Sequence, residues 1–506
     1  MPLPGDDLFF LIHALNPSEK RYFKLFAQRQ GNEKNKVYMK VFDLIDEQEE
    51  AYDEELLKKK LKSKGDIKML PQLKIYLFDL IVKSMRVYRS EKNAANEVFD
   101  LIQDELFYTE KGLTEMRVKA LRRAKELAYK FDLTYMLVAI LQRERVFAIR
   151  YSGGDPVAKI NLIHEEEQRV FKSLNNESEL GKIYYTLLAQ FVIDPKLNDP
   201  QKIEWLVGYK NHPLLQDINA IDTYYSKFLF LKCHGYIYRF SNDYQGMYQN
   251  NLALLTLMEQ YPQHHFNVLG NYMDAIASVL SAAHNLGKYE EFEGLLKKLD
   301  ELPKDKLKDE ATIAMNILHY KMLYYMNTAQ FDKSEEIINE CEHVLKKYSN
   351  QLSDSQFVSD VYNLSLFLFC KGDIHKSLHY CQEVLNFKTE SKQDLQHGAQ
   401  MLHLLLHYEL GNTVYLDSAL RNGIRSMQNK SRFNDFEKSF TGYIKKLIKT
   451  AEREKSGVYK EMYDFYLIMH RQNNHKRLVL IEETLAWAVS KVENKPLSET
   501  IFYKYK

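Results

Sequence analysis

The sequence is poor in the two residues that interrupt helices. Its 506 residues include only 19 glycines and 11 prolines. Helix interiors need neither residue, whereas sheets with many tight turns need both. No alternation of polar and apolar residues runs long enough to predict a strand. The sequence therefore predicts an all-α protein.

Cysteine is also scarce. The four cysteines, Cys233, Cys341, Cys370 and Cys381, form no C-x-x-C pair. A chain of this length can bury a large core and does not need disulfides to fold. We therefore expect four free thiols that pack as small hydrophobic side chains, in a reducing and hence cytoplasmic environment.

Long apolar runs and an excess of one charge are both missing. No uninterrupted apolar stretch approaches the roughly 18 residues that span a bilayer, and no basic segment precedes the first apolar run. We therefore expect no membrane association. The 70 Lys and Arg nearly balance the 69 Asp and Glu. This balance argues against a general polyanion binder and leaves a local basic patch open.

Catalytic motifs are absent as well. The chain has no G-x-S-x-G, no G-x-x-x-x-G-K-[ST] and no G-x-G-x-x-G segment. The pairs His375/His379 and His403/His407 have the i, i+4 spacing of helical metal ligands, but no carboxylate stands at a spacing that completes a set. We therefore predict a protein that is not an enzyme, with no cofactor and no metal site.

Proline and glycine mark the breaks between helical segments. "LNPSEK" at 15–20 predicts a helix start with Asn16 as the cap, and "IDPKLNDP" at 193–200 is the strongest linker candidate. These breaks suggest four domains. They are a helical N-terminal region at 1–92, a helix-hairpin region at 93–198, a repeat array at 199–430 and a helical C-terminal cap at 431–506.

The repeat array is predicted from a recurring turn. Each copy follows an apolar helix and precedes an amphipathic one, and successive copies begin 42, 43 and 39 residues apart. A small residue lets the chain reverse, and in the first three copies a bulky residue two positions later fills the angle between the helices. The copies are Gly287-Lys288-Tyr289, Ala329-Gln330-Phe331, Gly372-Asp373-Ile374 and Gly411-Asn412-Thr413, and a weaker unit surrounds Asn242.

This pattern resembles the tetratricopeptide repeat family, whose unit is a helix–turn–helix of about 34 residues. The third unit matches best, with large or small residues at the family's positions: Val361, Leu364, Ser365, Leu368, Gly372, Ile374, Ser377, Cys381 and Val384. The second unit matches at Phe331, Ser334, Ile338 and Cys341. The period here is nearer 42, Phe292 stands where the family has a small residue, and the fourth unit loses register. The resemblance covers 240–430 and implies an α-solenoid of antiparallel helix hairpins.

In the resembling family, the first helix of each hairpin lines a concave surface that holds a peptide or a partner helix. The positions that correspond here are Asp274, His284, Asn285, Asn316, His319, Asn327, Tyr362 and Phe369. The resemblance implies a non-catalytic scaffold, adaptor or sensor that binds a protein or peptide, with Tyr362 and Phe369 as anchors. The alternative is that these residues are solvated or pack against another part of the chain.

The segment from Leu56 to Arg89 is locally basic, with ten Lys and Arg against two Asp. Two short helices with a brief connection would give it a helix-turn-helix outline. This suggests a second hypothesis, a nucleic-acid-binding regulator with a ligand-sensing repeat domain. Its candidate phosphate contacts are Lys58, Lys59, Lys60, Lys62 and Lys64. The opposing interpretation is that the six acids at 47–55 neutralise these lysines.

Overall fold

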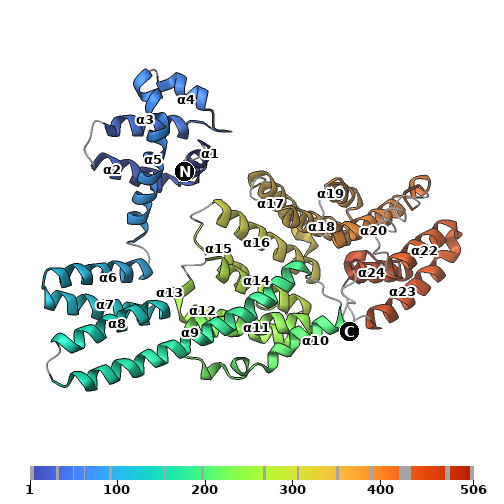
Figure 1. Cartoon of the computed structure of the whole chain (residues 1–506). Helices are drawn as coiled ribbons and strands as arrows, with labels where there is room; N and C mark the ends of the chain where they lie inside the picture. Colours follow the sequence, from blue (N-terminus) through green and yellow to red (C-terminus); the bar gives the residue numbers. More distant parts are fainter. Residues whose placement is uncertain are drawn as a thin grey trace. The chain divides into compact units, whose positions relative to one another are not determined.

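The structure is a computed structural model, and every element in its described part is a helix (Figure 1). The described residues are 5–29, 34–48, 51–61, 63–90, 94–151, 154–194, 199–265, 269–304, 307–348, 353–387, 393–416, 418–420, 435–472 and 479–501. The prediction of an all-α protein is confirmed for this part of the chain. The helices form because long stretches lack glycine and proline and repeat apolar residues at helical spacing.

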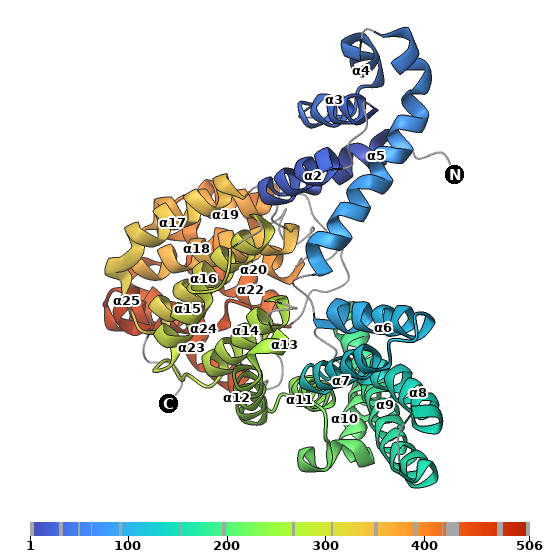
Figure 2. The same ribbon diagram turned by 90° about the vertical axis from the view of Figure 1, so that its left-hand side faces the viewer.

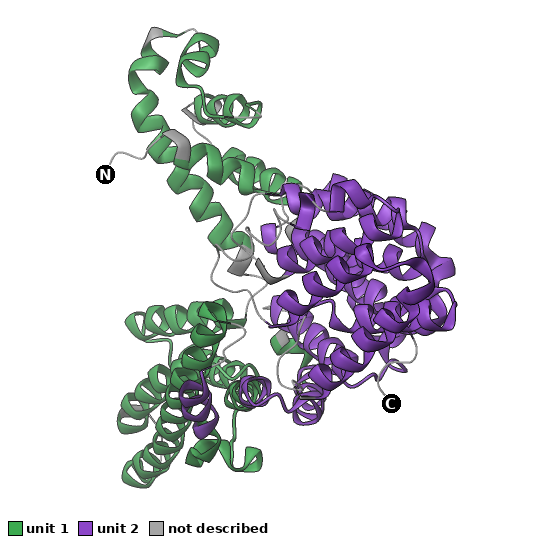
Figure 3. Ribbon diagram, turned by 90° about the vertical axis from the view of Figure 1, so that its right-hand side faces the viewer, with its two compact units in different colours: residues 1–195, 209–233, 261–267 green, residues 196–208, 234–260, 268–506 purple. Residues whose placement is uncertain are grey.

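The chain divides into two compact units, coloured green and purple in Figure 3. Unit 1 comprises Met1–Pro195, Tyr209–Cys233 and Tyr261–Asn267, and unit 2 comprises Lys196–Gly208, His234–Gln260 and Val268–Lys506. The four domain boundaries given above stay a prediction.

Unit 1 begins with five helices that surround an apolar core (Figure 2). They are α1 (Gly5–Ala14), α2 (Pro17–Arg29), α3 (Lys34–Asp46), α4 (Glu54–Leu61) and α5 (Lys64–Ser90). The long α5 contacts each of the other four. Asn16 caps α2 as predicted, since its Oδ1 accepts a hydrogen bond of 2.9 Å from the backbone N–H of Glu19.

The next four helices of unit 1 pack in chain order, each against the one before it. They are α6 (Ala94–Glu110), α7 (Thr114–Lys130), α8 (Thr134–Tyr151) and α9 (Pro156–Ile193). The Asp155 carboxylate caps the start of α9 by accepting hydrogen bonds from the N–H groups of Val157 and Ala158. The later parts of unit 1 include the 3-10 turns from Tyr209 to Ala220 and α13 (Pro262–His265), and α11 (Tyr224–Phe240) begins in it.

A buried ion pair joins three of these helices. The carboxylate of Glu105 on α6 is 2.6 Å from Nε of Arg117 on α7 and 3.2 Å from Nε of Arg143 on α8. The side chains of Glu105 and Arg117 are only 2% and 7% exposed. Each charge therefore depends on its partner, because water does not reach it.

Thirteen of the described α-helices lie within unit 2, and the C-terminal part of α11 belongs to it as well. They are α10 (Pro200–Gly208), α12 (Tyr244–Gln260), α14 (Leu269–Asn285), α15 (Phe292–Asp300), α16 (Leu307–Asn327), α17 (Ser334–Lys347), α18 (Asp354–Lys371), α19 (Ile374–Asn386), α20 (Gln393–Glu409), α22 (Asp435–Lys449), α23 (Lys455–Gln472), α24 (Ile481–Glu493) and α25 (Leu497–Thr500). The first helices of successive hairpins contact one another in the order α14, α16, α18 and α20. The second helices α15, α17 and α19 each contact the first helix of the next hairpin.

The same turn geometry ends several of the described helices. At this position the backbone is left-handed, with φ between 50° and 94°. The N–H of the following residue then donates to the carbonyl five residues back, at 2.8 to 3.0 Å, as in a Schellman cap. The left-handed residues of these turns are Gly112, Asp132, Asn242, Gly287, Ala329, Gly372, Gly411 and Asn494. The five from Asn242 to Gly411 are separated by 45, 42, 43 and 39 residues, and they include all four turns read from the sequence.

Small residues hold α18 and α19 close together. The hydroxyl of Ser365 donates to the carbonyl of Ser377 at 2.8 Å, and the hydroxyl of Ser377 donates to the carbonyl of Ser365 at 2.7 Å. Larger side chains would separate the two backbones and break both bonds. This explains why the third unit has small residues at these two positions.

Candidate functional site

A polar group of unit 2 lies on the first helices of the hairpins. We call it the first-helix site and define it by Asp274 on α14, His319 on α16, and Asp360 and Asn363 on α18. Asp274 is exposed, whereas His319 and Asn363 are half-buried. Since α14 contacts α16 and α16 contacts α18, the site runs across three successive hairpins.

A hydrogen bond between neighbouring hairpins orders the site. Nδ1 of His319 lies 2.9 Å from Oδ1 of Asp360 and 3.2 Å from the side-chain nitrogen of Asn363. The Asp360 side chain is only 4% exposed, whereas that of His319 is 31% exposed. An ionised carboxylate only accepts hydrogen bonds, so Nδ1 carries the hydrogen. This fixes the ring and leaves Nε2, which has no partner among the described residues, to bind another molecule.

Charges of both signs surround the base of the site. Burial raises the pKa of the Tyr320 hydroxyl; the positive charge of Arg239 opposes this rise, and Asp360 and Asp274 add to it. The Tyr320 hydroxyl donates to the carbonyl of Ala277 on α14 at 2.8 Å, so it stays a neutral donor that ties α16 to α14. The first-helix site therefore combines acidic, basic and imidazole groups.

Three of the predicted asparagines use their amide groups within their own helix. The side-chain nitrogens of Asn285, Asn316 and Asn327 each donate to the carbonyl four residues earlier, at 2.7, 2.9 and 2.6 Å. Nδ1 of His284 shares a hydrogen bond of 3.0 Å with the Tyr289 hydroxyl at the following turn. The structure does not bring these residues into the network around His319.

Tyr362 and Phe369, the two predicted anchors, lie in the core. They are 3% and 1% exposed, so no ligand reaches either ring in this arrangement. The physical reason is that α18 contacts α16, α17, α19 and α20 and is covered on several sides. The expectation that Tyr362 and Phe369 anchor a ligand is therefore corrected: both rings belong to the core.

Sequence reasoning missed Asp360 and Asn363. Both lie inside the apolar run "VSDVYNLSLFLF" of α18, where a charged residue is costly unless it has a partner. This cost is the sequence signal by which Asp360 could have been identified as a residue with a partner. The partner of Asp360 lies 41 residues earlier, close to one repeat, and only the stacking of the hairpins brings the two together.

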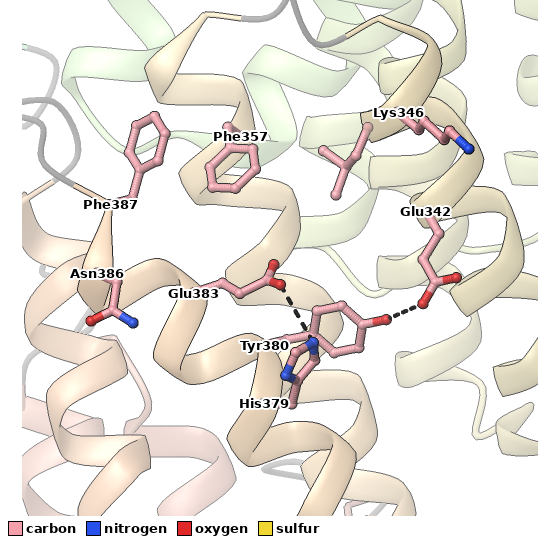
Figure 4. Close-up of a pocket in the computed structure, with 9 residues that line it drawn as sticks. Glu342, Lys346, Phe357, His379, Tyr380, Glu383, Asn386 and Phe387 are labelled. Atoms are coloured by element: carbon pink, nitrogen blue, oxygen red, sulfur yellow. Dashed lines mark hydrogen bonds and ion pairs between the residues drawn. The ribbon is translucent and has the colours of Figure 1, made fainter.

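A second feature of unit 2 is an open pocket of about 620 Å³ between α17, α18 and α19 (Figure 4). The rings of Phe357 and Phe387 stack at 4.6 Å on one side of it. The Tyr380 hydroxyl donates to Glu342 at 2.8 Å, and Nε2 of His379 pairs with Glu383 at 3.4 Å. Because these polar groups pair with each other, the pocket offers a ligand mainly an apolar patch.

Two of the candidate lysines in the basic N-terminal segment, Lys58 and Lys60, pair with acids. Nζ of Lys58 lies 3.1 and 2.8 Å from the carboxylates of Glu54 and Glu55, and Nζ of Lys60 lies 2.8 Å from that of Glu47. Lys59 is exposed. Lys62 lies outside the described residues, and the side chain of Lys64 is not described either. The described contacts therefore favour the interpretation in which the acidic block neutralises these lysines.

The two histidine pairs lie in different environments. His375 and His379 are exposed on α19, whereas His403 and His407 are buried on α20 with ring centroids 4.5 Å apart. Burial and the neighbouring His407 lower the pKa of His403 to about 4, so the buried pair is neutral at pH 7. Within the described residues, no group of three or more His, Cys, Asp or Glu is placed to hold a metal ion.

All four cysteines are free and buried, as predicted. Burial raises the pKa of Cys233, Cys341 and Cys381 to about 12, which makes these thiols poor nucleophiles. Among the helices of the described segments, none combines the length and the apolar character that a membrane crossing requires.

Comparison with known proteins found no family model, no curated protein and no solved structure that matches the chain. The class of protein must therefore be argued from the residues and their contacts.

Proposed function

We propose that the chain is a non-catalytic scaffold, adaptor or sensor, built as a tetratricopeptide-like α-solenoid, that binds a protein or peptide at the first-helix site. The repeated turn supports this architecture. Five left-handed caps in unit 2 recur at intervals of 39 to 45 residues, and the first helices contact one another in chain order. A stack of this kind presents a continuous surface to an extended ligand.

The observation that carries the proposal is the hydrogen bond between His319 and Asp360. It joins two successive hairpins through a buried carboxylate, while the His319 side chain is 31% exposed and its Nε2 has no partner among the described residues. A buried carboxylate needs a partner, and an apolar pair would fill the same space at a lower desolvation cost. A role in recognition explains why a polar pair occupies this position.

The ligand that suits this site is an extended peptide segment. Nε2 of His319 can accept or donate a hydrogen bond, and Asp274 supplies an exposed acceptor one hairpin away. An extended chain offers backbone N–H and carbonyl groups that can pair with polar groups of this kind. The site has no cluster of Lys and Arg to hold a terminal carboxylate, so we propose an internal segment as the ligand.

The test is affinity capture from the native host's lysate with a matched pair of variants. The site variant is Asp274→Lys/His319→Gln, in which glutamine can still donate to Asp360 and the fold is retained. The control variant is His379→Gln/Glu383→Gln, which removes a 3.4 Å pair from α19 in the other helix layer. Captured proteins are identified by mass spectrometry after nuclease treatment, and circular dichroism checks that both variants fold.

The proposal predicts a defined protein partner that survives nuclease, is lost with the site variant and is retained by the control. Loss with the control alone would move the interface to the pocket of Figure 4. Capture that disappears on nuclease treatment would favour the nucleic-acid hypothesis, and Lys59→Glu would then weaken retention on DNA. Equal capture by all three proteins would contradict a role for the first-helix site.

A further inference from the structure

Unit 1 contains an apolar cavity of about 570 Å³ between α7, α8 and α9, three helices that lie side by side in Figure 1. Its walls include Val118 and Leu121 from α7, Phe147 from α8, and Leu162 and Ile163 from α9. Leu162 is 64% exposed, so the cavity opens to solvent beside an apolar side chain that nothing in the described structure covers. The volume lies within the range of small-molecule sites, about 300 to 1,000 Å³.

The acidic groups around this cavity are already paired. Nζ of Lys125 lies 2.7 Å from Glu144 and 2.8 Å from Glu166. The Tyr129 hydroxyl also donates to Glu166. Glu126 lies 4.0 Å from Arg123. These contacts fix one end of the cavity and leave few free acceptors for a cationic ligand.

The guanidinium of Arg122 is different. Arg122 lines the cavity, is exposed, and forms no ion pair with any described residue. Lys159 brings a second positive charge to the same lining. A guanidinium binds a carboxylate through two parallel hydrogen bonds, which gives both affinity and orientation.

We propose that this cavity binds an anionic amphiphile, a small molecule with an apolar body and a carboxylate head group. The apolar body would lie against Val118, Leu121 and Phe147, where it leaves water. The carboxylate would lie on Arg122 at the rim. This site belongs to unit 1, whereas the first-helix site belongs to unit 2, so the two proposals stand or fall separately.

The neighbouring Arg123 provides a matched control. It stands one residue along α7, carries the same charge, does not line the cavity, and has partners in Glu97 on α6 at 3.5 Å and Glu126 at 4.0 Å. The probes are decanoate and decyltrimethylammonium, which share a ten-carbon chain and differ in the sign of the head group. Each is titrated by calorimetry into the full chain below its micelle concentration.

We expect decanoate to bind at one saturable site and the cationic probe to show no saturation. Arg122→Ala should weaken decanoate binding about tenfold or more, the loss expected for a hydrogen-bonded charge pair. Arg123→Ala should change it by less than about twofold, as expected for a partly solvated pair elsewhere. Circular dichroism spectra of both variants would show that the helices are intact.

Three results would overturn the proposal. The first is no saturable binding of decanoate to the full chain. The second is equal affinity for the two probes, which would indicate apolar adsorption without charge selection. The third is an equal loss in both arginine variants, which would place the carboxylate away from the cavity rim.

Discussion

The buried pair of Glu105 and Arg117 allows the most quantitative test of how unit 1 is held together. Replacing Glu105 by alanine removes the acceptor of a 2.6 Å contact and leaves the guanidinium of Arg117, whose side chain is 7% exposed, inside the helix layer. The ring of Phe147 lies 5.4 Å from that guanidinium and compensates only part of the charge. The variant therefore removes the carboxylate that lies closest to this buried charge in the described contacts.

The expected cost follows from this geometry. Removing one partner of a buried ion pair costs about 3 to 5 kcal/mol. Since about 1.4 kcal/mol corresponds to a factor of ten, opening of this helix layer should become roughly 100- to 3,000-fold more frequent. Arg143 also contacts Glu105, but its side chain is 28% exposed and water can replace the lost contact.

Hydrogen exchange followed by mass spectrometry is the suitable assay. It reports the opening of α6 and α7 separately, whereas a global melt of a chain with two compact units is not a two-state transition. The control is Glu97→Ala on the same helix, which removes a pair whose side chains are about half exposed. Such pairs contribute less than about 1 kcal/mol, so exchange should rise by no more than a few-fold.

A second variant separates charge from packing. Glu105→Leu/Arg117→Leu removes both charges and keeps apolar volume in the core. It should recover most of the protection that Glu105→Ala loses, because the buried guanidinium is gone and the remaining Arg143 is 28% exposed to water. If Glu105→Ala and Glu97→Ala change the exchange of α6 and α7 equally, the reasoning from burial is refuted.

Three further predictions concern local backbone strain and pH. Ala329→Gly should stabilise unit 2 by about 0.5 to 1 kcal/mol and Gly372→Ala should destabilise it by about 1 kcal/mol, because both residues have positive φ. Lys74 and Lys58 lower the pKa of Glu54 from 4.5 to about 2. The stability that Glu54 contributes is therefore present above pH 4.5 and is lost between pH 4.5 and 2. In urea titrations, Glu54→Gln should reduce the fall of the unfolding free energy over this pH range. The pKa of His403 is lowered from 6.5 to about 4, so the unfolded chain binds the proton first and stability falls between pH 6.5 and 4; His403→Gln should reduce that fall.

Each of these predictions has a control within the chain. Gly294 lies inside α15 with open space around it, so Gly294→Ala should stabilise rather than destabilise, in contrast to Gly372→Ala. The same sign for both alanine variants would contradict the argument from φ. For the prediction on Glu54, Glu55→Gln is the control, since the Glu55 side chain is 84% exposed. An unchanged slope in Glu54→Gln, or a slope lost in Glu55→Gln as well, would contradict the assignment of that window.

The helices and their turns could be predicted because both depend on local sequence. Helical spacing of apolar residues is a property of a single segment, so it can be recognised without knowing what packs against the helix. The turns were readable where glycine occupies the left-handed position, as at Gly287 and Gly372. Asp132 was not identified as a turn residue, because aspartate occurs at many other positions in a chain.

The site could be predicted only in part, because burial depends on the neighbours of a helix. Tyr362 and Phe369 stand at positions that are open to a ligand in the resembling family, yet α18 contacts five other helices of unit 2 and both rings are enclosed. The pairing of His319 with Asp360 depends on how two hairpins stack. Periodicity along one helix carries no information on either point.

In unit 2 the turn after each first helix recurs more regularly than the lengths of the helices beside it. The second helix α15 has 9 residues and the first helix α16 has 21, whereas the left-handed cap and its hydrogen bond recur at the turn after each first helix from α14 to α20. A Schellman cap fixes the local path of the chain within a few residues and places no limit on the helices beside it. Hairpins of unequal length can therefore stack in order, which reconciles the long and variable period with contacts between successive first helices. It also explains why Asp360 on α18 pairs with His319, 41 residues earlier on α16, because these two first helices contact each other.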